Sequence, residues 1–291
     1  MKHQIIQGDC LETLGTLPDD HFQTCITSPP YWLLRDYETP GQIGLEESLK
    51  DHLQALVQVF QQVRRVLRPD GTLWVNYGDK YAGGGGGGSS AIETRKPEYG
   101  RETKAYDKCN GRLNGRSSLG LGFKNKDLMG LPWRLAFALQ ADGWWLRSDI
   151  VWNKPDAMPQ AVTDRPASAH EFLFLLSPAA KYYYNADAVE PRGANGDRVN
   201  LRDVWNIPSP GFGKLPHFAT FPPALVEPCI KAGSRPGDHV LDPFGGAGTV
   251  GLVADRLGRS CTLLELNPEY IETAKQRIYS DAPLFCEVET K

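Results

Sequence analysis

A hydroxyl residue, two prolines and two aromatic residues follow one another in the stretch TSPPYW, residues 27–32. The Ser28 hydroxyl and the Pro29 carbonyl can accept hydrogen bonds, and consecutive prolines hold the backbone rigid without adding an N–H donor. Tyr31 and Trp32 add flat aromatic faces. The preceding FQTCI is typical of a short strand, so these groups are expected at a strand end. Together they could hold a planar, hydrogen-bond-donating group.

A second chemical signal is the glycine-rich stretch VLDPFGGAGTVGLVADRLGRSCTLLELN, residues 240–267. It predicts a strand ending at Asp242, a tight turn, a helix and a second strand ending at Glu265. Glycines let a nucleoside ligand approach the backbone, and an acid about 20 positions later can accept hydrogen bonds from ribose hydroxyls. The spacing is not quite G-x-G-x-x-G, so a turn without ligand and a nicotinamide dehydrogenase remain alternatives. Asp242 favours a ligand with an ammonium group, as in S-adenosylmethionine (SAM).

Strands and helices alternate on either side of these two motifs, which predicts an α/β fold with parallel strands and crossover helices. We expect strands at residues 3–9, 22–26, 72–78, 144–154, 170–177, 180–185, 239–242 and 260–266. We expect helices at residues 10–17, 46–67, 126–143, 222–233, 249–258 and 268–278, and a turn at residues 68–71.

Composition and charge narrow the class of protein. The chain has 291 residues, 41% of them hydrophobic, and no apolar run long enough to span a membrane. Its six cysteines form no C-x-x-C pair, which argues against a zinc site or a disulfide framework and favours a reducing cytoplasm. His170 and Glu171 have no further ligand at helical spacing, so no metal site is expected.

A basic segment stands out against an acidic chain. The net charge is −3, yet residues 80–126 hold ten Lys or Arg and four Asp or Glu, which leaves about −9 for the rest. A local basic patch can direct a polyanion to one face of a protein. This segment includes residues 83–120, a Gly-rich and then polar stretch without periodicity. We interpret it as an insertion loop, either DNA-binding or simply solvated.

The two motifs together resemble those of the amino-methylating DNA methyltransferases. That family carries a catalytic [D/N/S]-P-P-[Y/F/W] tetrapeptide, matched here by SPPY at residues 28–31, and a cofactor motif, matched by DPFGGAGT at residues 242–249. The catalytic motif precedes the cofactor motif, as in the permuted beta-type members. The resemblance covers most of residues 4–280. It implies a Rossmann-like SAM-dependent methyltransferase fold in circularly permuted order, with a mixed, mostly parallel sheet and helices on both faces.

The resemblance also implies roles for individual residues. Ser28, Pro29, Pro30 and Tyr31 would be catalytic: the Ser28 hydroxyl and Pro29 carbonyl would hold an exocyclic amine, and Tyr31 would stack on a base flipped out of the duplex. Trp32 would lie beside that base and contact DNA. SAM would be the cofactor and S-adenosylhomocysteine the product. The cofactor-binding residues implied are Asp9, Cys10, Thr220, Phe221, Asp242, Phe244, Gly245, Gly246, Gly248, Thr249 and Glu265. Asp9 also suits a helix N-cap.

The predicted organisation is a catalytic domain of residues 1–82 and 121–291, the insertion loop at 83–120 and a loop or target-recognition region at about 185–216. Double-stranded DNA is the expected partner of a monomer or homodimer in the cytoplasm, bacterial or phage-encoded. The basic residues expected to contact DNA phosphates are Arg95, Lys96, Arg101, Lys104, Arg112 and Arg116.

Ser28 at the first position of the tetrapeptide favours methylation of cytosine N4, since members with Asp there usually methylate adenine N6. Adenine N6 remains the alternative. A non-catalytic DNA-binding protein with the same fold and an RNA methyltransferase are more distant possibilities. The recognised DNA sequence cannot be deduced from these residues.

Overall fold

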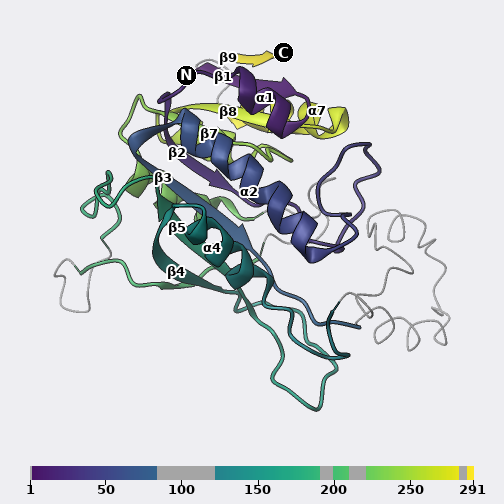
Figure 1. Ribbon diagram of the computed structural model, residues 1–291. Coiled ribbons are helices and arrows are strands. Elements are labelled where there is room, and N and C mark those ends of the chain that lie inside the picture. The colour runs from purple at the N-terminus through teal and green to yellow at the C-terminus, as the bar shows by residue number, and fades with distance from the viewer. Residues whose placement is uncertain (1, 84–121, 191–198, 210–220, 282–286) are drawn as a thin grey trace, which may run out of the picture.

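The computed structural model describes residues 2–83, 122–190, 199–209, 221–281 and 287–291. Its strands form one nine-stranded sheet in the order β6-β4-β5-β3-β2-β7-β8-β1-β9, which Figure 1 shows from β4 to β9. The strands are β1 (Lys2–Gln7), β2 (Phe22–Thr27), β3 (Leu67–Tyr77), β4 (Trp145–Asn153), β5 (His170–Ser177), β6 (Val204–Asn206), β7 (His239–Asp242), β8 (Ser260–Glu265) and β9 (Glu287–Thr290).

Of the described strands, β5 runs antiparallel to both its neighbours, and every other pairing in the sheet is parallel. This confirms the predicted mixed, mostly parallel sheet. The reversal has a consequence for the site, because the amino end of β5 lies at the same edge of the sheet as the carboxyl ends of the other strands.

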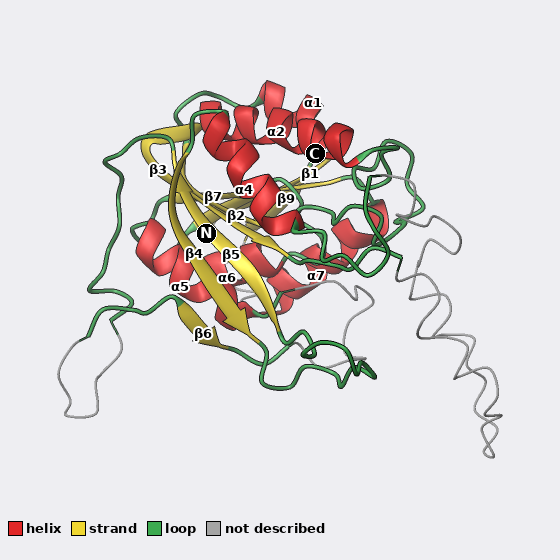
Figure 2. Ribbon diagram, turned by 60° about the horizontal axis from the view of Figure 1, so that its bottom comes forward, coloured by secondary structure: helices red, strands yellow, loops and turns green. Residues whose placement is uncertain are grey.

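Helices cover both faces of the sheet, as predicted (Figure 2). One face carries α1 (Cys10–Thr16), α2 (Leu49–Val66) and α4 (Leu131–Ala141); the other carries α5 (Pro223–Gly233), α6 (Thr249–Arg256) and α7 (Pro268–Asp281). The longest, α2, shows why. Leu56, Val59, Phe60 and Val63 recur at helical spacing and are all buried against the sheet, and the Ser48 hydroxyl caps its first turn.

The structure differs from the sequence-based expectations in several elements. Residues 68–71 are a bulge within β3 rather than a turn, since Phe22 pairs with Leu67 while Thr24 pairs with Thr72. Residues 180–185 form no strand. Helix α4 begins at Leu131 instead of residue 126, because Gly130 adopts a left-handed conformation (φ 65°). The short edge strands β6 and β9 were not predicted.

The carboxyl edge of the sheet collects the polar strand ends. Gly8-Asp9 follows β1, Ser28 follows β2, Gly78-Asp79 follows β3, Asp242 ends β7 and Glu265 ends β8. In open α/β sheets, ligands bind outside the carboxyl ends of the strands, where the chain crosses to opposite faces. That point lies between β2, which continues to α2 on one face, and β7, which continues to α6 on the other.

Candidate active site

Strand pairing brings the two sequence motifs into direct contact. β2 and β7 are neighbours in the sheet, with Cys25 opposite Leu241. One residue before the SPPY motif, the Thr27 hydroxyl donates a hydrogen bond of 2.7 Å to Asp242 Oδ1, across 215 positions of sequence. The catalytic and cofactor motifs therefore begin side by side at the same edge.

Both motifs line one cavity of about 880 Å³, a volume that includes its open mouth. This is within the usual size of small-molecule sites. Of the predicted residues, the cavity is lined by Asp9, Cys10, Ser28, Pro30, Phe221, Asp242, Phe244, Gly245, Gly246, Thr249 and Glu265. Gly248 is not among the lining residues, and Thr220 lies outside the described residues.

The cavity wall has the mixed chemistry that SAM requires. Asp242 and Glu265 offer carboxylates to an ammonium group and to ribose hydroxyls. Phe221, Ile43 and Leu264 offer apolar surface for an adenine ring. SAM carries a sulfonium and an ammonium charge beside an uncharged nucleoside, so acids at one part of the wall and apolar side chains at another fit the molecule.

Asp242 is buried and held in place before any ligand arrives. Its Oδ1 accepts hydrogen bonds from the Thr27 hydroxyl and, at 3.0 Å, from the Phe244 N–H. Burial raises the pKa of Asp242 to about 7, although these two hydrogen bonds act in the opposite direction. A carboxylate so costly to ionise would gain from a cationic partner.

Glu265 closes the glycine turn. Its two carboxylate oxygens accept from the backbone N–H groups of Gly246 at 2.7 Å and Asn267 at 2.8 Å. Burial raises the pKa of Glu265 above its ordinary value. Gly245 must be glycine here, because a Cβ would stand 2.9 Å from the Cβ of Leu263. The turn therefore lies flat against β8, leaving space above it.

Asp9 has the N-cap role that sequence analysis allowed. Its Oδ1 accepts from the N–H groups of Leu11 and Glu12 at 2.9 and 3.0 Å, and the residue also lines the cavity. The adjacent Cys10 is buried, and burial raises the pKa of its thiol to about 12. Cys10 is therefore a neutral wall residue rather than a nucleophile.

Tyr31 is held by polar groups from β3 and β5. Its hydroxyl donates to Glu171 Oε2 at 2.9 Å and lies 3.2 Å from Asn76 Oδ1, while the Ser28 hydroxyl lies 3.5 Å away. Burial raises the pKa of Tyr31, with a further contribution from the charge of Glu171, so the phenol stays protonated. Lys154, at the end of β4, forms an ion pair with Glu171.

This Tyr31, Asn76, Glu171 and Lys154 cluster was missed by sequence reasoning. β3, β4 and β5 are adjacent, and the reversed β5 places Glu171 at the carboxyl edge. The available signal was polar: Asn76 interrupts the buried strand TLWVNY, and Glu171 precedes the apolar run FLFLL. Neither residue indicates by itself which strand end it meets.

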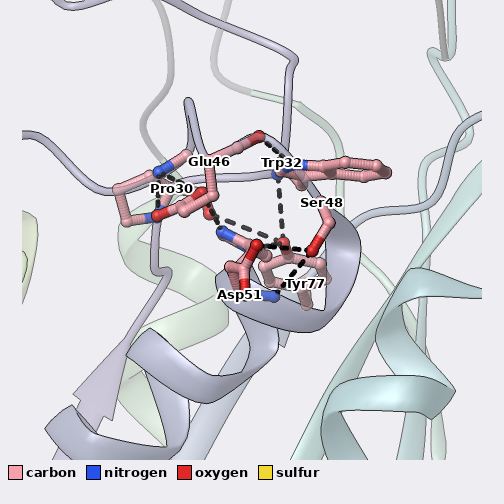
Figure 3. Close-up of polar contacts among 8 residues, drawn as sticks. Pro30, Trp32, Glu46, Ser48, Asp51 and Tyr77 are labelled. Carbon is pink, nitrogen blue, oxygen red and sulfur yellow. Dashed lines mark hydrogen bonds and ion pairs between the residues drawn. The ribbon is translucent and has the colours of Figure 1, made fainter. Parts of the chain in front are cut away.

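Trp32 does not lie where the sequence suggested. Its side chain is completely buried, its Nε1 donates to the carbonyl of Glu46 at 3.0 Å, and its backbone N–H donates to the Tyr77 hydroxyl at 3.2 Å (Figure 3). The structure thus places Trp32 in the core instead of on a DNA-facing surface. The apolar environment of α2 and β3 outweighs the exposure expected for a residue after two prolines.

A polar network supports the SPPY backbone from below (Figure 3). The Tyr77 hydroxyl lies 2.7 Å from His52 Nε2, and His52 Nδ1 lies 2.8 Å from Glu46. Burial acts to raise the pKa of Glu46, but hydrogen bonds from His52 and from the Gly44 N–H outweigh it and lower that pKa. Helix α2 therefore fixes the chain at Trp32 through Tyr77.

The loop that follows the SPPY motif also lines the cavity, which sequence analysis missed. It contributes Tyr37, Thr39, Gly41, Gln42 and Ile43. The signal available was TPGQ, a turn sequence. Leu266, Asn267 and Tyr270, which follow β8, line the cavity as well.

The six basic residues expected to contact DNA, from Arg95 to Arg116, lie outside the described residues. The described chain stops at Gly83 and resumes at Gly122, and an isolated bridge between Tyr81 and Leu128 holds these two ends together. The insertion thus leaves and re-enters the fold close to the carboxyl end of β3. No helix among the described residues is long and apolar enough to cross a membrane.

Comparison with known proteins agrees with this geometry. The chain is 48% identical over 277 residues to the Type II methyltransferase M.Cfr9I of Citrobacter freundii, covering 95% of this chain and 88% of that protein. It is 47% identical over 280 residues to the Type II methyltransferase M.SmaI of Serratia marcescens, covering 94% and 90%.

Solved structures share the fold. The DNA modification methylase TTHA0409 of Thermus thermophilus, solved in complex with S-adenosyl-L-methionine, is 25% identical with a TM-score of 0.64 and covers 98% of this chain and 99% of that one. The PvuII DNA methyltransferase, described as cytosine-N4-specific, is 20% identical with a TM-score of 0.70 and covers 99% and 96%. The N6/N4 methyltransferase family model, described as DNA methylase, matches residues 22–276. The chain therefore belongs to the N6/N4 family of DNA methylases, enzymes that use SAM.

Proposed function

We propose that this DNA methyltransferase transfers the methyl group of SAM to the exocyclic N4 of cytosine in duplex DNA. The observation that carries the proposal is the position of Ser28. It follows β2 within the same cavity as Asp242 and Glu265, and its side chain is a neutral hydrogen-bond acceptor. The fold shared with a cytosine-N4-specific enzyme is compatible with this choice but does not decide the base.

The chemistry explains why acceptors are needed. The lone pair of an exocyclic amine is delocalised into the ring, so the nitrogen is a poor nucleophile. The Ser28 hydroxyl and the Pro29 carbonyl would accept its two N–H hydrogens and turn the lone pair toward the methyl donor. Placement and fixed dipoles then supply most of the rate. The sulfonium–methyl bond breaks, the N–methyl bond forms, and the nitrogen loses one proton.

Tyr31 would receive the base after it is flipped from the duplex. A flipped base loses its stacking partners, and an aromatic ring in the pocket replaces them. The Glu171 and Asn76 contacts hold the Tyr31 hydroxyl, and its ring packs 4.6 Å from that of Tyr77. The ring is therefore fixed in orientation before DNA binds.

The choice of base is tested by product analysis. Duplexes in which either cytosines or adenines carry the candidate site are incubated with labelled SAM and digested to nucleosides. N4-methylcytosine is expected. Finding 6-methyladenine as the only methylated product would overturn the proposal in favour of adenine N6, the alternative that a neutral acceptor also permits.

The catalytic assignment is tested by Ser28→Ala and Tyr31→Ala. Loss of a positioned acceptor typically lowers kcat by about 100- to 1,000-fold. SAM affinity measured by calorimetry provides the control, since a folded variant still binds the cofactor. Methyl transfer at the wild-type rate in both variants would contradict the roles of Ser28 and Tyr31, and would leave a different residue as the acceptor.

Two further alternatives have specific tests. A non-catalytic DNA-binding protein with this fold would bind DNA without methylating it, although an intact Ser28, Asp242 and Glu265 argue against it. An RNA methyltransferase would label RNA in preference to duplex DNA of the same sequence. Parallel assays of both substrates with labelled SAM distinguish these outcomes.

A further inference from the structure

The strongest unexplained feature lies in the loop that joins the SPPY motif to α2. The Leu33 N–H donates to the Gly44 carbonyl at 2.7 Å, so residues 33–44 leave and return at one point. Inside this loop, Gln42 N–H donates to the Thr39 carbonyl at 3.2 Å. Gly41 has φ +82°, and with Pro40 before it this is the sequence and geometry of a type II turn. The turn faces the cofactor cavity.

The side chain of Gln42 is fixed by one end only. Its Oε1 accepts from the N–H groups of Tyr37 at 2.9 Å and Thr39 at 3.3 Å. Two backbone donors determine which atom is the oxygen, because a flipped amide would place its NH₂ against them. The amide nitrogen must therefore point away from the loop.

That nitrogen is a buried donor in want of an acceptor. Gln42 Nε2 has less than 1 Å² of exposed surface and no hydrogen-bond partner among the described residues, while Gln42 itself lines the cavity. An unsatisfied buried donor costs roughly 1–3 kcal/mol. A loop that fixes the oxygen twice and leaves the nitrogen free is arranged to satisfy a group that arrives from outside.

The position of the loop indicates which part of the cofactor is near. Tyr37, whose N–H holds Gln42, lines the same wall as Glu265 and Tyr270. Burial raises the pKa of the Tyr37 phenol, and the neighbouring Arg35, Tyr270 and Glu265 also influence it. The loop thus lies over the carboxyl end of β8, where an acid would hold ribose hydroxyls, and away from the glycine turn below.

We propose that Gln42 is a cofactor-positioning residue whose Nε2 donates a hydrogen bond to an acceptor on the nucleoside half of bound SAM. The inference rests on the placement of SAM in this cavity, which is part of the proposed function, and is independent of the target base. It also links the catalytic motif to the cofactor, since the same short segment carries both.

The decisive variant is Gln42→Glu. A carboxylate has the same shape and can still accept from Tyr37 and Thr39, so the turn keeps its support, but it has no hydrogen to donate. Gln54→Glu, at an exposed position of α2, makes the same charge change and serves as the matched control. Binding of SAM and of 5′-methylthioadenosine, which lacks the amino-acid part, is measured by calorimetry.

Gln42→Glu should weaken the binding of both ligands by a similar factor, about tenfold or more, with the thermal unfolding midpoint unchanged and Gln54→Glu like wild type. Weaker binding of SAM alone would overturn the nucleoside assignment. Unchanged binding of both ligands would overturn the inference if Asp242→Asn weakens SAM binding. If Asp242→Asn also binds SAM normally, the placement of SAM in this cavity is wrong as well.

Discussion

At the scale of single residues, the site is prepared by groups whose protonation and direction are set before any ligand binds. Asp242 carries a costly charge, the Tyr31 phenol is kept protonated, and the Cys10 thiol is kept neutral. These conditions follow from burial at the carboxyl edge, and they lead to measurable pH and mutant effects.

Asp242 should make SAM binding pH-dependent. Because a bound ammonium group favours the ionised carboxylate, and the pKa of Asp242 is about 7, affinity should fall roughly tenfold per pH unit below pH 7 and level off above it. Calorimetry from pH 5.5 to 8 measures this slope. Asp242→Asn should bind weakly with a flat profile, and a sloping profile in that variant would assign the titration to another group.

The same group acts on stability with the opposite sign. The folded-state pKa of about 7 lies above the ordinary aspartate value of roughly 3.9, so the native state holds the proton longer. The resulting stabilisation is complete below about pH 4 and is lost as pH rises to 7. Without cofactor, wild type should therefore lose unfolding free energy over this range relative to Asp242→Asn, as urea denaturation at several pH values would show.

Glu171 should act through Tyr31. Tyr31→Phe keeps the stacking ring but removes the hydroxyl, and Glu171→Gln removes the charge that receives it. Each should lower kcat by about 10- to 100-fold, as expected for removal of a hydrogen bond to a charged group, with SAM affinity unchanged.

The double variant should be little worse than either single one, because both changes break one contact. Glu227→Gln, which breaks an exposed pair with Lys231 on α5, is the matched control and should leave kcat unchanged. Fully additive losses in the double variant would show that Tyr31 and Glu171 act independently.

At the scale of elements, the glycine turn shows how two helices depend on one small residue. Gly248 precedes α6 in a left-handed conformation (φ +75°), and a Cβ there would stand 2.7 Å from the Cβ of Ala274 on α7. Gly237 has a similar φ of +88° with open space around it. The two sites separate backbone strain from steric overlap.

Gly237→Ala should therefore cost about 1–2 kcal/mol of unfolding free energy, the backbone penalty alone. Gly248→Ala should cost that amount plus roughly 1–3 kcal/mol more for overpacking α6 against α7. Urea denaturation of both variants measures the difference. Equal losses would mean that α7 moves aside without penalty.

At the scale of the whole molecule, the permuted order of motifs has no structural cost because sheet order, not chain order, sets their distance. The cofactor motif lies more than 200 positions after the catalytic motif, yet Thr27 and Asp242 share a hydrogen bond. The rest of the molecule then needs one surface that attracts DNA to this edge, since the net charge of the chain is −3.

The basic insertion should provide that attraction. Replacement of its six residues (Arg95, Lys96, Arg101, Lys104, Arg112 and Arg116) by Gln should weaken DNA binding and reduce the dependence of affinity on salt. The logarithmic slope should fall by about 0.9 for each phosphate that these side chains no longer neutralise. SAM affinity should not change. Fluorescence anisotropy at several salt concentrations measures the slope, and an unaltered slope would rule out phosphate binding by these residues.

The sequence by itself determined the local elements around the motifs, their chemistry and the family. Alternating strands and helices, the rigid SPPY segment and the glycine turn are all encoded by neighbouring residues, and each follows from the sequence alone. Trp32 was misplaced because exposure is not a local property: the side chain after two prolines could face solvent or pack against α2, and only packing decides.

Only the tertiary structure decided which strand ends meet. The pairing of β2 with β7, the reversal of β5 that carries Glu171 to Tyr31, and the free amide nitrogen of Gln42 all depend on how the described segments fold against one another. Hydrophobic periodicity specifies that a strand is buried but not which strand lies beside it. That neighbour is chosen by packing of the whole sheet with its helices, and the site forms where the chosen ends converge.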